Sequence, residues 1–205
     1  MLKIWGRANS VNVMKALWAA DEVGRRFERV DIGGPFGGND QPAYLALNPN
    51  GRIPTIEDDG FVLWESNAIV RYLAARYGAG TLWPDDVAVR ATADAWMDWQ
   101  QTTAVGPMTT LFWGLVRTAP DKRDPAALEA ARRQAAAAWT ILDRTLERTP
   151  FVAGARFTMG DIPAGALVHR WFALDIERPD LPALAAWYAR LKQRPGYAHV
   201  NQKMS

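Results

Sequence analysis

The stretch from Asn48 to Pro54 reads Asn-Pro-Asn-Gly-Arg-Ile-Pro, and the pair Glu65-Ser66 follows shortly after it. These residues decide the fold of the first half of the chain. The Asn-Pro-Asn-Gly run is typical of a turn, and Pro54 places a residue without an N–H group at the mouth of a strand, which leaves a backbone edge free. Ser66 opens a helix, where unpaired N–H groups and the positive end of the dipole favour an anion. A free strand edge beside a helix N-terminus suits a small peptide that carries a carboxylate.

Working outward from this stretch, the periodicity predicts a β-α-β unit, a loop, and a β-β-α unit. The expected elements are a strand at 2–5, a helix that ends at Gly24, a strand at 27–32, a glycine-rich loop at 33–40, a brief helix at 44–47, a hairpin of strands 53–57 and 61–64, and a helix at 65–77. A strand–helix–strand order favours parallel pairing of the first two strands. The glycine-rich loop matches neither nucleotide-binding fingerprint, because the spacing differs and no Gly-Lys-Ser/Thr follows. The acidic run 57–59 lies at the hairpin turn, and we interpret it as solvated.

Beyond about residue 80 the composition becomes alanine-rich and helical. The sequence therefore predicts a first domain at 1–80, a linker at 81–87 and an all-helical domain at 88–205, an α/β plus all-α fold. The expected helices are 88–118, with a kink or break at Gly106-Pro107, then 126–148, one that follows the capping-box pattern of Thr158 and Asp161, and one from Pro182 to about Arg194. The spacing of Thr158 and Asp161 lets their side chains pair with the free N–H groups at a helix start, so we assign both residues to folding.

Composition and charge exclude several classes of function. The net charge of +2 is too small to indicate a nucleic-acid or membrane partner. The chain has no cysteine, which excludes a catalytic thiol, a disulfide framework and a thiolate metal site. His169 and His199 lie far apart and offer no metal-ligand spacing. No apolar run reaches membrane-spanning length and the first residues do not resemble a signal peptide, so we expect a cytoplasmic protein.

Four motifs in a fixed order carry a family resemblance. They are Trp5-Gly6 with Ser10-Val11-Asn12, the stretch 48–54, Trp64-Glu65-Ser66-Asn67-Ala68-Ile69, and Thr158-Met159-Gly160-Asp161-Ile162. With the change to helical sequence near residue 80, the chain resembles the soluble (cytosolic-type) glutathione transferases over nearly its full length, and in particular bacterial members with a serine in the active site. The resemblance implies an N-terminal thioredoxin-like domain, a helical C-terminal domain, a homodimer and a glutathione site.

The chemistry that such a site requires is modest. Glutathione reacts as a thiolate, and a thiol of pKa about 8.5 is mostly protonated at neutral pH. Lowering that pKa by two units needs about 2.7 kcal/mol. One charge-assisted hydrogen bond supplies roughly 1.5–3 kcal/mol, and a helix N-terminus adds about 0.3–1 kcal/mol. Ser10, at the start of the first helix, can therefore suffice. From the residues alone an ordinary N-cap is the better explanation of Ser10, and the family resemblance reverses that preference. Asn12 and Asn9 are the rival donors.

The resemblance also implies the residues that bind glutathione. The Ile53-Pro54 bond is cis in the family, and Ile53 offers its backbone N–H and C=O to the cysteinyl part of the tripeptide. Glu65 binds the γ-glutamyl ammonium and Ser66 the γ-glutamyl carboxylate, a role that is compatible with capping. Arg52 and Gln41 are candidates for the glycyl carboxylate, while Arg52 also fits a solvated surface position.

The pocket for the electrophile is less evident from the sequence. Its candidates are Arg7, Phe36, Met108, Phe112, Trp113 and Arg117. Aromatic residues at helical spacing are more often part of a core than of a pocket lining. Five tryptophans fit helix packing well: Trp96, Trp99, Trp139, Trp171 and Trp187.

We therefore expect a detoxifying glutathione transferase that conjugates glutathione, its co-substrate, to small hydrophobic or halogenated electrophiles, with no metal and no bound cofactor. One alternative is a glutathione-dependent disulfide-bond reductase or peroxidase on the same fold. Because the enzyme has no cysteine, such a reaction needs two glutathione molecules at one site. The other alternative is a non-catalytic, transferase-like binding protein.

Overall fold

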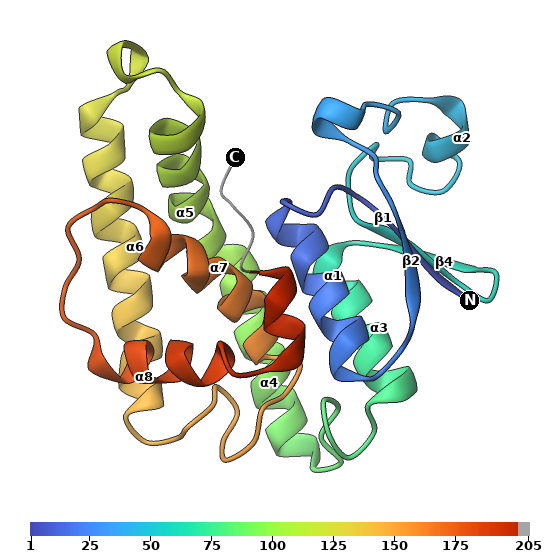
Figure 1. Cartoon of the computed structure of the whole chain (residues 1–205). Coiled ribbons are helices and arrows are strands. Elements are labelled where there is room, and N and C mark those ends of the chain that lie inside the picture. The colour runs from blue at the N-terminus through green and yellow to red at the C-terminus, as the bar shows by residue number, and fades with distance from the viewer. Residues whose placement is uncertain (201–205) are drawn as a thin grey trace. The chain divides into compact units, whose positions relative to one another are not determined.

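The structure, a computed structural model, describes residues 1–200. The chain divides into two compact units (Figure 1). The first contains residues 1–85 together with 194–200, and the second contains residues 86–193. The expected boundary near residue 80 thus falls close to the observed division. The expectation that the whole stretch from residue 88 onward is one helical domain differs from the structure, because 194–200 returns to the first unit.

The first unit is a four-stranded sheet with helices. Its elements are β1 (Leu2–Trp5), α1 (Val11–Glu22), β2 (Phe27–Val30), a 3-10 turn (Gly34–Phe36), α2 (Pro42–Leu45), β3 (Thr55–Asp58), β4 (Phe61–Trp64) and α3 (Ser66–Tyr77). The strand order is β2-β1-β3-β4, with β1 parallel to β2 and the other pairs antiparallel. The predicted parallel β-α-β unit and the hairpin are both confirmed.

In β1, fully buried side chains alternate with partly buried ones, and the buried ones face the helices that cover the sheet. Leu2 and Ile4 are fully buried while the residues between and after them are only partly so. Helices α1 and α3 pack side by side on the sheet (Figure 1). They bury Val13 and Leu17 from α1 and Leu73 from α3. This packing sets the N-termini of both helices near the loop that precedes β3.

The C-terminal segment, residues 194–200, completes the first unit. Within it, Tyr197 packs edge-on against Trp18 of α1, with ring centroids 5.6 Å apart. Arg194 Nε donates to Glu22 at 2.9 Å. At Gly196, a Cβ atom would lie 2.3 Å from Trp18 Cδ1. Only glycine allows the segment to approach α1 this closely.

The second unit consists of helices. They are α4 (Val87–Trp99), α5 (Val105–Phe112), a 3-10 turn (Pro120–Lys122), α6 (Pro125–Leu146), α7 (Asp161–Ala173) and α8 (Pro182–Leu191), with π-helical turns at Gln100–Ala104 and Trp113–Arg117. The predicted kink or break at Gly106-Pro107 takes the form of a π-helical turn directly before α5. Pro107 has no N–H group to donate to the preceding turn, and a π-turn accommodates this loss without ending the helix.

The core of the second unit confirms the predicted packing of Trp139, Trp171 and Trp187, which are almost fully buried. Asp161 organises the start of α7, as its spacing predicted. Its carboxylate accepts bonds from the N–H groups of Val152 and Thr158, at 3.0 and 2.9 Å, and from the Trp187 indole at 2.9 Å. Burial raises the pKa of Asp161 to about 6, and these donors oppose the rise.

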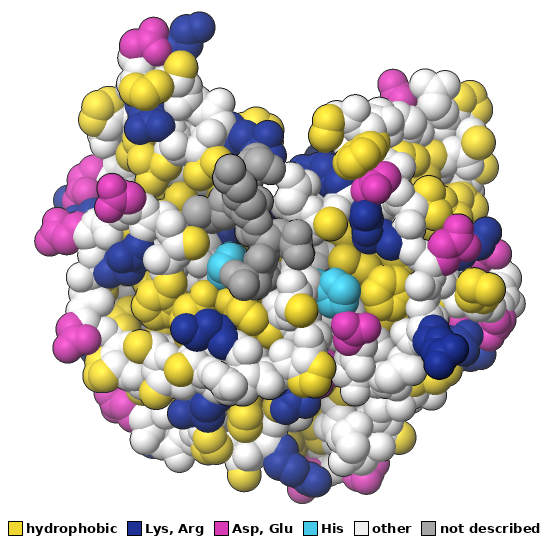
Figure 2. All heavy atoms as spheres, in the orientation of Figure 1, with side chains coloured by type: hydrophobic (Ala, Val, Ile, Leu, Met, Phe, Trp, Pro, Cys, Tyr) yellow, Lys and Arg dark blue, Asp and Glu magenta, His cyan; other side chains and the backbone are white. Residues whose placement is uncertain are grey.

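On the face drawn in Figure 2, charged side chains of one sign do not gather into a large patch. Lys/Arg and Asp/Glu side chains are interspersed over both units there (Figure 2). Among residues 1–200, no helix combines the length and apolarity needed to cross a bilayer.

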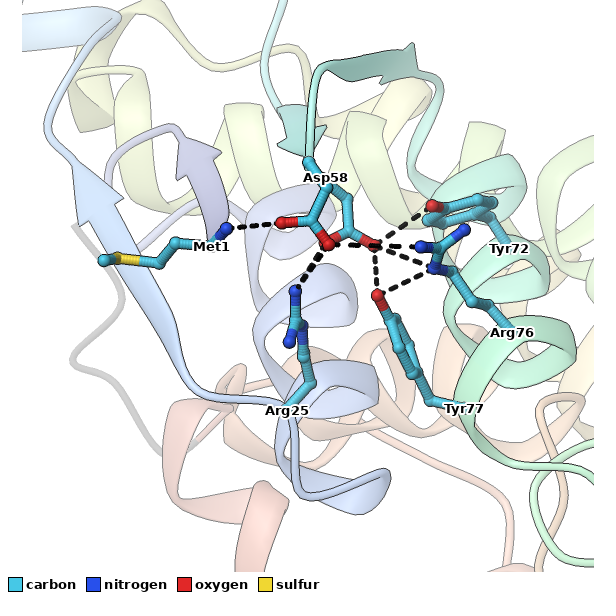
Figure 3. Close-up of polar contacts among 7 residues, drawn as sticks. Met1, Arg25, Asp58, Tyr72, Arg76 and Tyr77 are labelled. Atoms are coloured by element: carbon cyan, nitrogen blue, oxygen red, sulfur yellow. Dashed lines mark hydrogen bonds and ion pairs between the residues drawn. The ribbon is translucent and has the colours of Figure 1, made fainter.

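Asp58 corrects one expectation, because it is not a solvated turn residue. Its side chain is fully buried. It accepts hydrogen bonds from Tyr77 at 2.5 Å, Tyr72 at 3.0 Å and Arg25 at 3.0 Å, and Arg76 Nε lies 3.4 Å away (Figure 3). Burial alone would raise its pKa, but the bonds from the two tyrosines and Arg25 outweigh burial, so the pKa of Asp58 lies below its usual value. The carboxylate thereby ties the end of β3 to α3 and to the turn after α1.

We expect Asp58→Asn to lower the free energy of unfolding by about 2 kcal/mol at pH 7, because charge-assisted bonds become neutral ones. A lowered folded-state pKa means that this stabilisation is complete above the unfolded-state pKa of about 4 and is lost as pH falls through the folded-state pKa. Urea unfolding at pH 7 and at lower pH should therefore show the difference from wild type shrinking with acid.

Asp59→Asn is the matched control for this substitution. Asp59 is half exposed and pairs with the amino terminus of Met1, with Arg25 at 3.2 Å and with Arg76 at 4.0 Å. An exposed pair contributes little, so this variant should unfold close to wild type. Equal destabilisation by the two substitutions would contradict a central role for Asp58.

Candidate active site

The loop before β3 is held in place by side chains from beneath. The carbonyl of Arg52 accepts from the Tyr44 hydroxyl and from Asn48 Nδ2, each at 2.7 Å. Asn48 Nδ2 also lies 3.2 Å from Thr55 Oγ1, and Asn48 Oδ1 accepts from the N–H of Asn50 at 3.0 Å. Asn48 and Tyr44 are buried. One buried amide thus links the turn, the loop and the first residue of β3.

Ile53 lies directly after this fixed carbonyl. The Ile53-Pro54 peptide bond is cis, as the resemblance implies. Among the described residues, no hydrogen bond uses the N–H or C=O of Ile53. A Cβ atom at Gly33 would approach Ile53 Cδ1 to 3.2 Å, so the glycine-rich loop packs closely over this side chain. The backbone of Ile53 is therefore a free edge held in a fixed position.

Glu65 and Ser66 form the start of α3. Glu65 occupies the N-cap position with φ of 71°, which is unusual for a residue with a side chain, and its side chain is exposed. Ser66 is the first helical residue, so the capping interpretation of Ser66 is wrong. Its buried hydroxyl instead lies 3.3 Å from Asn12 Oδ1, and Lys15 Nζ lies 3.4 Å from the same hydroxyl.

Ser10 occupies the N-cap position of α1, with extended φ and ψ of −83° and 123°. Its hydroxyl makes no hydrogen bond to the helix it precedes, and the residue is 8% exposed. In the two rival amides the oxygens are engaged, because Asn9 Oδ1 accepts from Arg7 at 2.6 Å and Asn12 Oδ1 accepts from Ser66 at 3.3 Å, but these bonds do not use the Nδ2 donors. The N-cap position predicted from sequence is thus present, but the capping bond is not.

The remaining candidates of the first unit lie at its surface. Arg52 is exposed, and Gln41, also exposed, precedes α2 and donates to Asp40 at 3.1 Å. The Arg7 side chain packs against Gly34 of the glycine-rich loop. Phe36, 57% exposed, stands on the same loop.

The other four candidates for the electrophile pocket belong to the second unit. Met108 and Phe112 are buried there, as aromatic and apolar residues at helical spacing commonly are. Trp113 is 60% exposed and lines a shallow pocket of that unit together with Thr110 of α5, Lys122 of the 3-10 turn and residues at the start of α6. The Arg117 guanidinium lies 5.7 Å from the centre of the Phe112 ring.

Sequence reasoning missed three residues that organise the site. Asn48 and Tyr44 hold the loop before Ile53, and only the Asn-Pro-Asn-Gly turn hinted at the first of them. Lys15 is fully buried next to Ser66. The signal that could have indicated Lys15 is its position in a mostly apolar helical run, between Met14 and Ala16.

Comparison with known proteins agrees with this fold. The family described as "Glutathione S-transferase, N-terminal domain" matches residues 1–75, and "Glutathione S-transferase, C-terminal domain" matches residues 125–190. The chain therefore belongs to the glutathione S-transferase family, and it is a glutathione transferase with a thioredoxin-like first domain.

Individual relatives cover nearly the whole chain. Glutathione S-transferase GstB of Escherichia coli strain K12 is 40% identical over 202 residues, which is 98% of this chain and 97% of the relative. A theta class glutathione S-transferase from Xanthomonas axonopodis pv. citri, solved with glutathione bound, is 51% identical with a TM-score of 0.96, over 100% of this chain and 99% of that one. Disulfide-bond oxidoreductase YfcG of E. coli strain K12 is 30% identical over 85% of this chain and 81% of the relative.

We expect Asn48→Ala to raise the KM for glutathione several-fold and to lower the melting temperature. The substitution leaves the Arg52 carbonyl with one donor fewer and frees the loop that carries Ile53; a buried polar group that loses its partner costs about 1–3 kcal/mol. Steady-state kinetics and thermal unfolding measure the two effects. Asn50→Ala is the control, because Asn50 is exposed and keeps its backbone bond to Asn48. A wild-type KM in Asn48→Ala would contradict the importance of this anchor.

Proposed function

We propose that this protein activates the thiol of glutathione through a hydrogen bond from the Ser10 hydroxyl and conjugates it to a small electrophile. The observation that carries the proposal is the Ser10 hydroxyl itself, which stands at the N-terminus of α1 without a capping bond. It is therefore available to donate to a sulfur anion beside the positive end of the helix. No general base is required, because the thiol proton passes to solvent water.

The chemical step balances without any further reactant. The thiolate sulfur forms a bond to the electrophilic carbon, and the leaving group, such as a halide, departs with the electron pair of the broken bond. Ser10 contributes by favouring the thiolate over the thiol. A tenfold rate effect corresponds to about 1.4 kcal/mol, which one charge-assisted hydrogen bond can supply. The reaction needs no metal and no bound cofactor besides glutathione as co-substrate.

Glutathione lies, in this proposal, along the free edge between the loop before β3 and the start of α3. The backbone of Ile53, which precedes Pro54, pairs with the cysteinyl residue. Ser66 and the N-terminus of α3 bind the γ-glutamyl carboxylate, and Glu65 binds the ammonium. Arg52 and Gln41 are near enough to the same loop to serve the glycyl carboxylate. The relative from Xanthomonas axonopodis pv. citri, which was solved with glutathione bound, supports this class of ligand.

The electrophile, in the same proposal, is small and hydrophobic or halogenated, which suits a role in detoxification. The proposed contacts are those expected from the sequence: Arg7, Phe36, Met108, Phe112, Trp113 and Arg117. Phe36 and Trp113 are the strongest of them, because both expose an aromatic surface on their own unit.

We further propose a cytoplasmic homodimer. Strand β4 forms one edge of the sheet and exposes two aromatic residues, Phe61 at 49% and Trp64 at 38%. An open sheet edge with exposed aromatic side chains favours association with a second chain.

A second activity, glutathione-dependent reduction of disulfides, is favoured by one comparison, the 30% identity to the oxidoreductase YfcG. Because this chain has no cysteine, one glutathione would attack the substrate disulfide and a second would release the product as oxidised glutathione. Turnover of an aryl halide and of a small dialkyl disulfide, measured at equal glutathione concentration, separates the two activities. We expect the specificity constant to be higher for the halide; the reverse order would make reduction the main activity.

We expect Ser10→Ala to lower kcat for conjugation by roughly 10- to 100-fold, the range that one charge-assisted hydrogen bond of about 1.5–3 kcal/mol allows. The affinity for glutathione should stay within a few-fold of wild type. Ultraviolet absorbance of the bound thiolate against pH should show the pKa of the bound thiol rising toward that of free glutathione.

Asn9→Ala and Asn12→Ala are the matched controls, since each removes one rival donor from the same turn. Unchanged turnover in Ser10→Ala, together with a raised thiol pKa in Asn12→Ala, would transfer the role to Asn12.

A further inference from the structure

Lys15 is a buried cation that the proposed reaction does not use. Its residue is fully buried within the first unit. Its ammonium group lies 3.2 Å from Asn67 Oδ1 and 3.4 Å from Ser66 Oγ, so it meets the first turn of α3 from the side of α1. Burying a lysine charge is costly and therefore uncommon. A cation at this place calls for a reason beyond packing, because the N-terminus of α3 is already positive.

The hydrogen-bonding capacity of lysine fixes the role of the Ser66 hydroxyl. An ammonium group carries donors and no acceptor, so the Ser66 oxygen must accept from Lys15. The single hydroxyl proton of Ser66 is then left to be donated outward. Its present acceptor is Asn12 Oδ1 at 3.3 Å, and both this bond and the 3.4 Å bond from Lys15 are long and hence weak. A carboxylate would accept the same proton in a shorter, charge-assisted bond.

We propose that Lys15 is a positioning residue that makes the α3 N-terminus selective for a peptide with a free γ-glutamyl carboxylate. It does so by orienting the Ser66 hydroxyl as a donor and by adding positive charge behind it. The inference rests on the proposed binding of glutathione at Glu65 and Ser66, but it does not depend on how the thiol is activated. Lys15 touches the ligand only through Ser66, so its removal should affect binding far more than chemistry.

The test is a binding cycle with two peptides. One is S-methylglutathione; the other is its analogue in which 4-aminobutanoyl replaces γ-glutamyl, which removes only the carboxylate. Isothermal titration should show wild type binding the first peptide at least tenfold more tightly. Lys15→Met should bind S-methylglutathione at least tenfold more weakly than wild type does, with affinity for the analogue changed less than twofold. This pattern isolates the coupling between Lys15 and the carboxylate.

Three further variants separate positioning from folding. Lys15→Arg keeps the charge and should retain most of the discrimination. Lys15→Gln is neutral but polar, and it serves in the same cycle if Lys15→Met fails to fold. Lys3→Met removes a half-exposed lysine of β1 and should behave as wild type. In kinetics, the KM for glutathione of Lys15→Gln should rise at least tenfold, while kcat at saturating glutathione stays within about twofold.

The possible failures are distinguishable. If a folded neutral variant discriminates between the two peptides as wild type does, or if wild type binds both equally, the role of Lys15 is overturned. If both peptides lose affinity in parallel in Lys15→Gln, the residue is structural only, which also overturns it. Failure of wild type to bind S-methylglutathione at all would instead overturn the proposed function.

Discussion

The anchored carbonyl of Arg52 is the constraint on which the candidate site depends. Two buried donors, Tyr44 and Asn48, hold it from the interior, so the next residue cannot turn its backbone inward. Ile53 consequently presents a free N–H and C=O at a fixed place beside the starts of α1 and α3. Binding energy need not be spent on ordering this segment, because the fold has already ordered it. The starts of α1 and α3 lie on either side of this edge and supply positive potential there.

Buried polar groups define this protein at three further points, each with a different task. Asp161 gathers donors from separate segments and fixes the start of α7. Asp58 gathers two tyrosines and two arginines at the far end of the first unit and thereby ties β3 to α3. Lys15 lies at the opposite end of α3, where its ammonium group contacts Ser66 and Asn67. Buried charged side chains thus contact α3 in its C-terminal half and at its N-terminal end.

Much of the fold could be predicted from local patterns. Alternation in residues 2–5, helical spacing after Ser10 and the Asp-Gly turn at 59–60 are local signals, and the corresponding elements are present. The candidate site could be proposed from the sequence because its parts are local motifs: a turn, a proline and two helix starts. Whether Ser10 activates the thiol stays a prediction.

The errors concern contacts between residues that are distant in sequence. The spacing of Asp58 within a hairpin gave no indication that Arg25 and Tyr77 converge on it, so a buried carboxylate was interpreted as a solvated one. Ser66 was interpreted as a cap because its hydroxyl partners, Asn12 and Lys15, come from another helix. The return of residues 194–200 to the first unit likewise depends on the fit of Gly196 against Trp18, which no periodicity contains.

This return has a consequence for how the protein is made. The surface of α1 around Trp18 is covered by Tyr197, so the first unit lacks part of its own packing until residues 194–200 have been synthesised. On the ribosome, the strands and helices of residues 1–85 emerge early and must wait with an aromatic surface exposed while the helical unit is translated. Residues 194–200 then cover that surface. Completion of the first unit is thereby coupled to synthesis of the helices that precede residue 194, and a chain truncated before that residue carries an exposed Trp18.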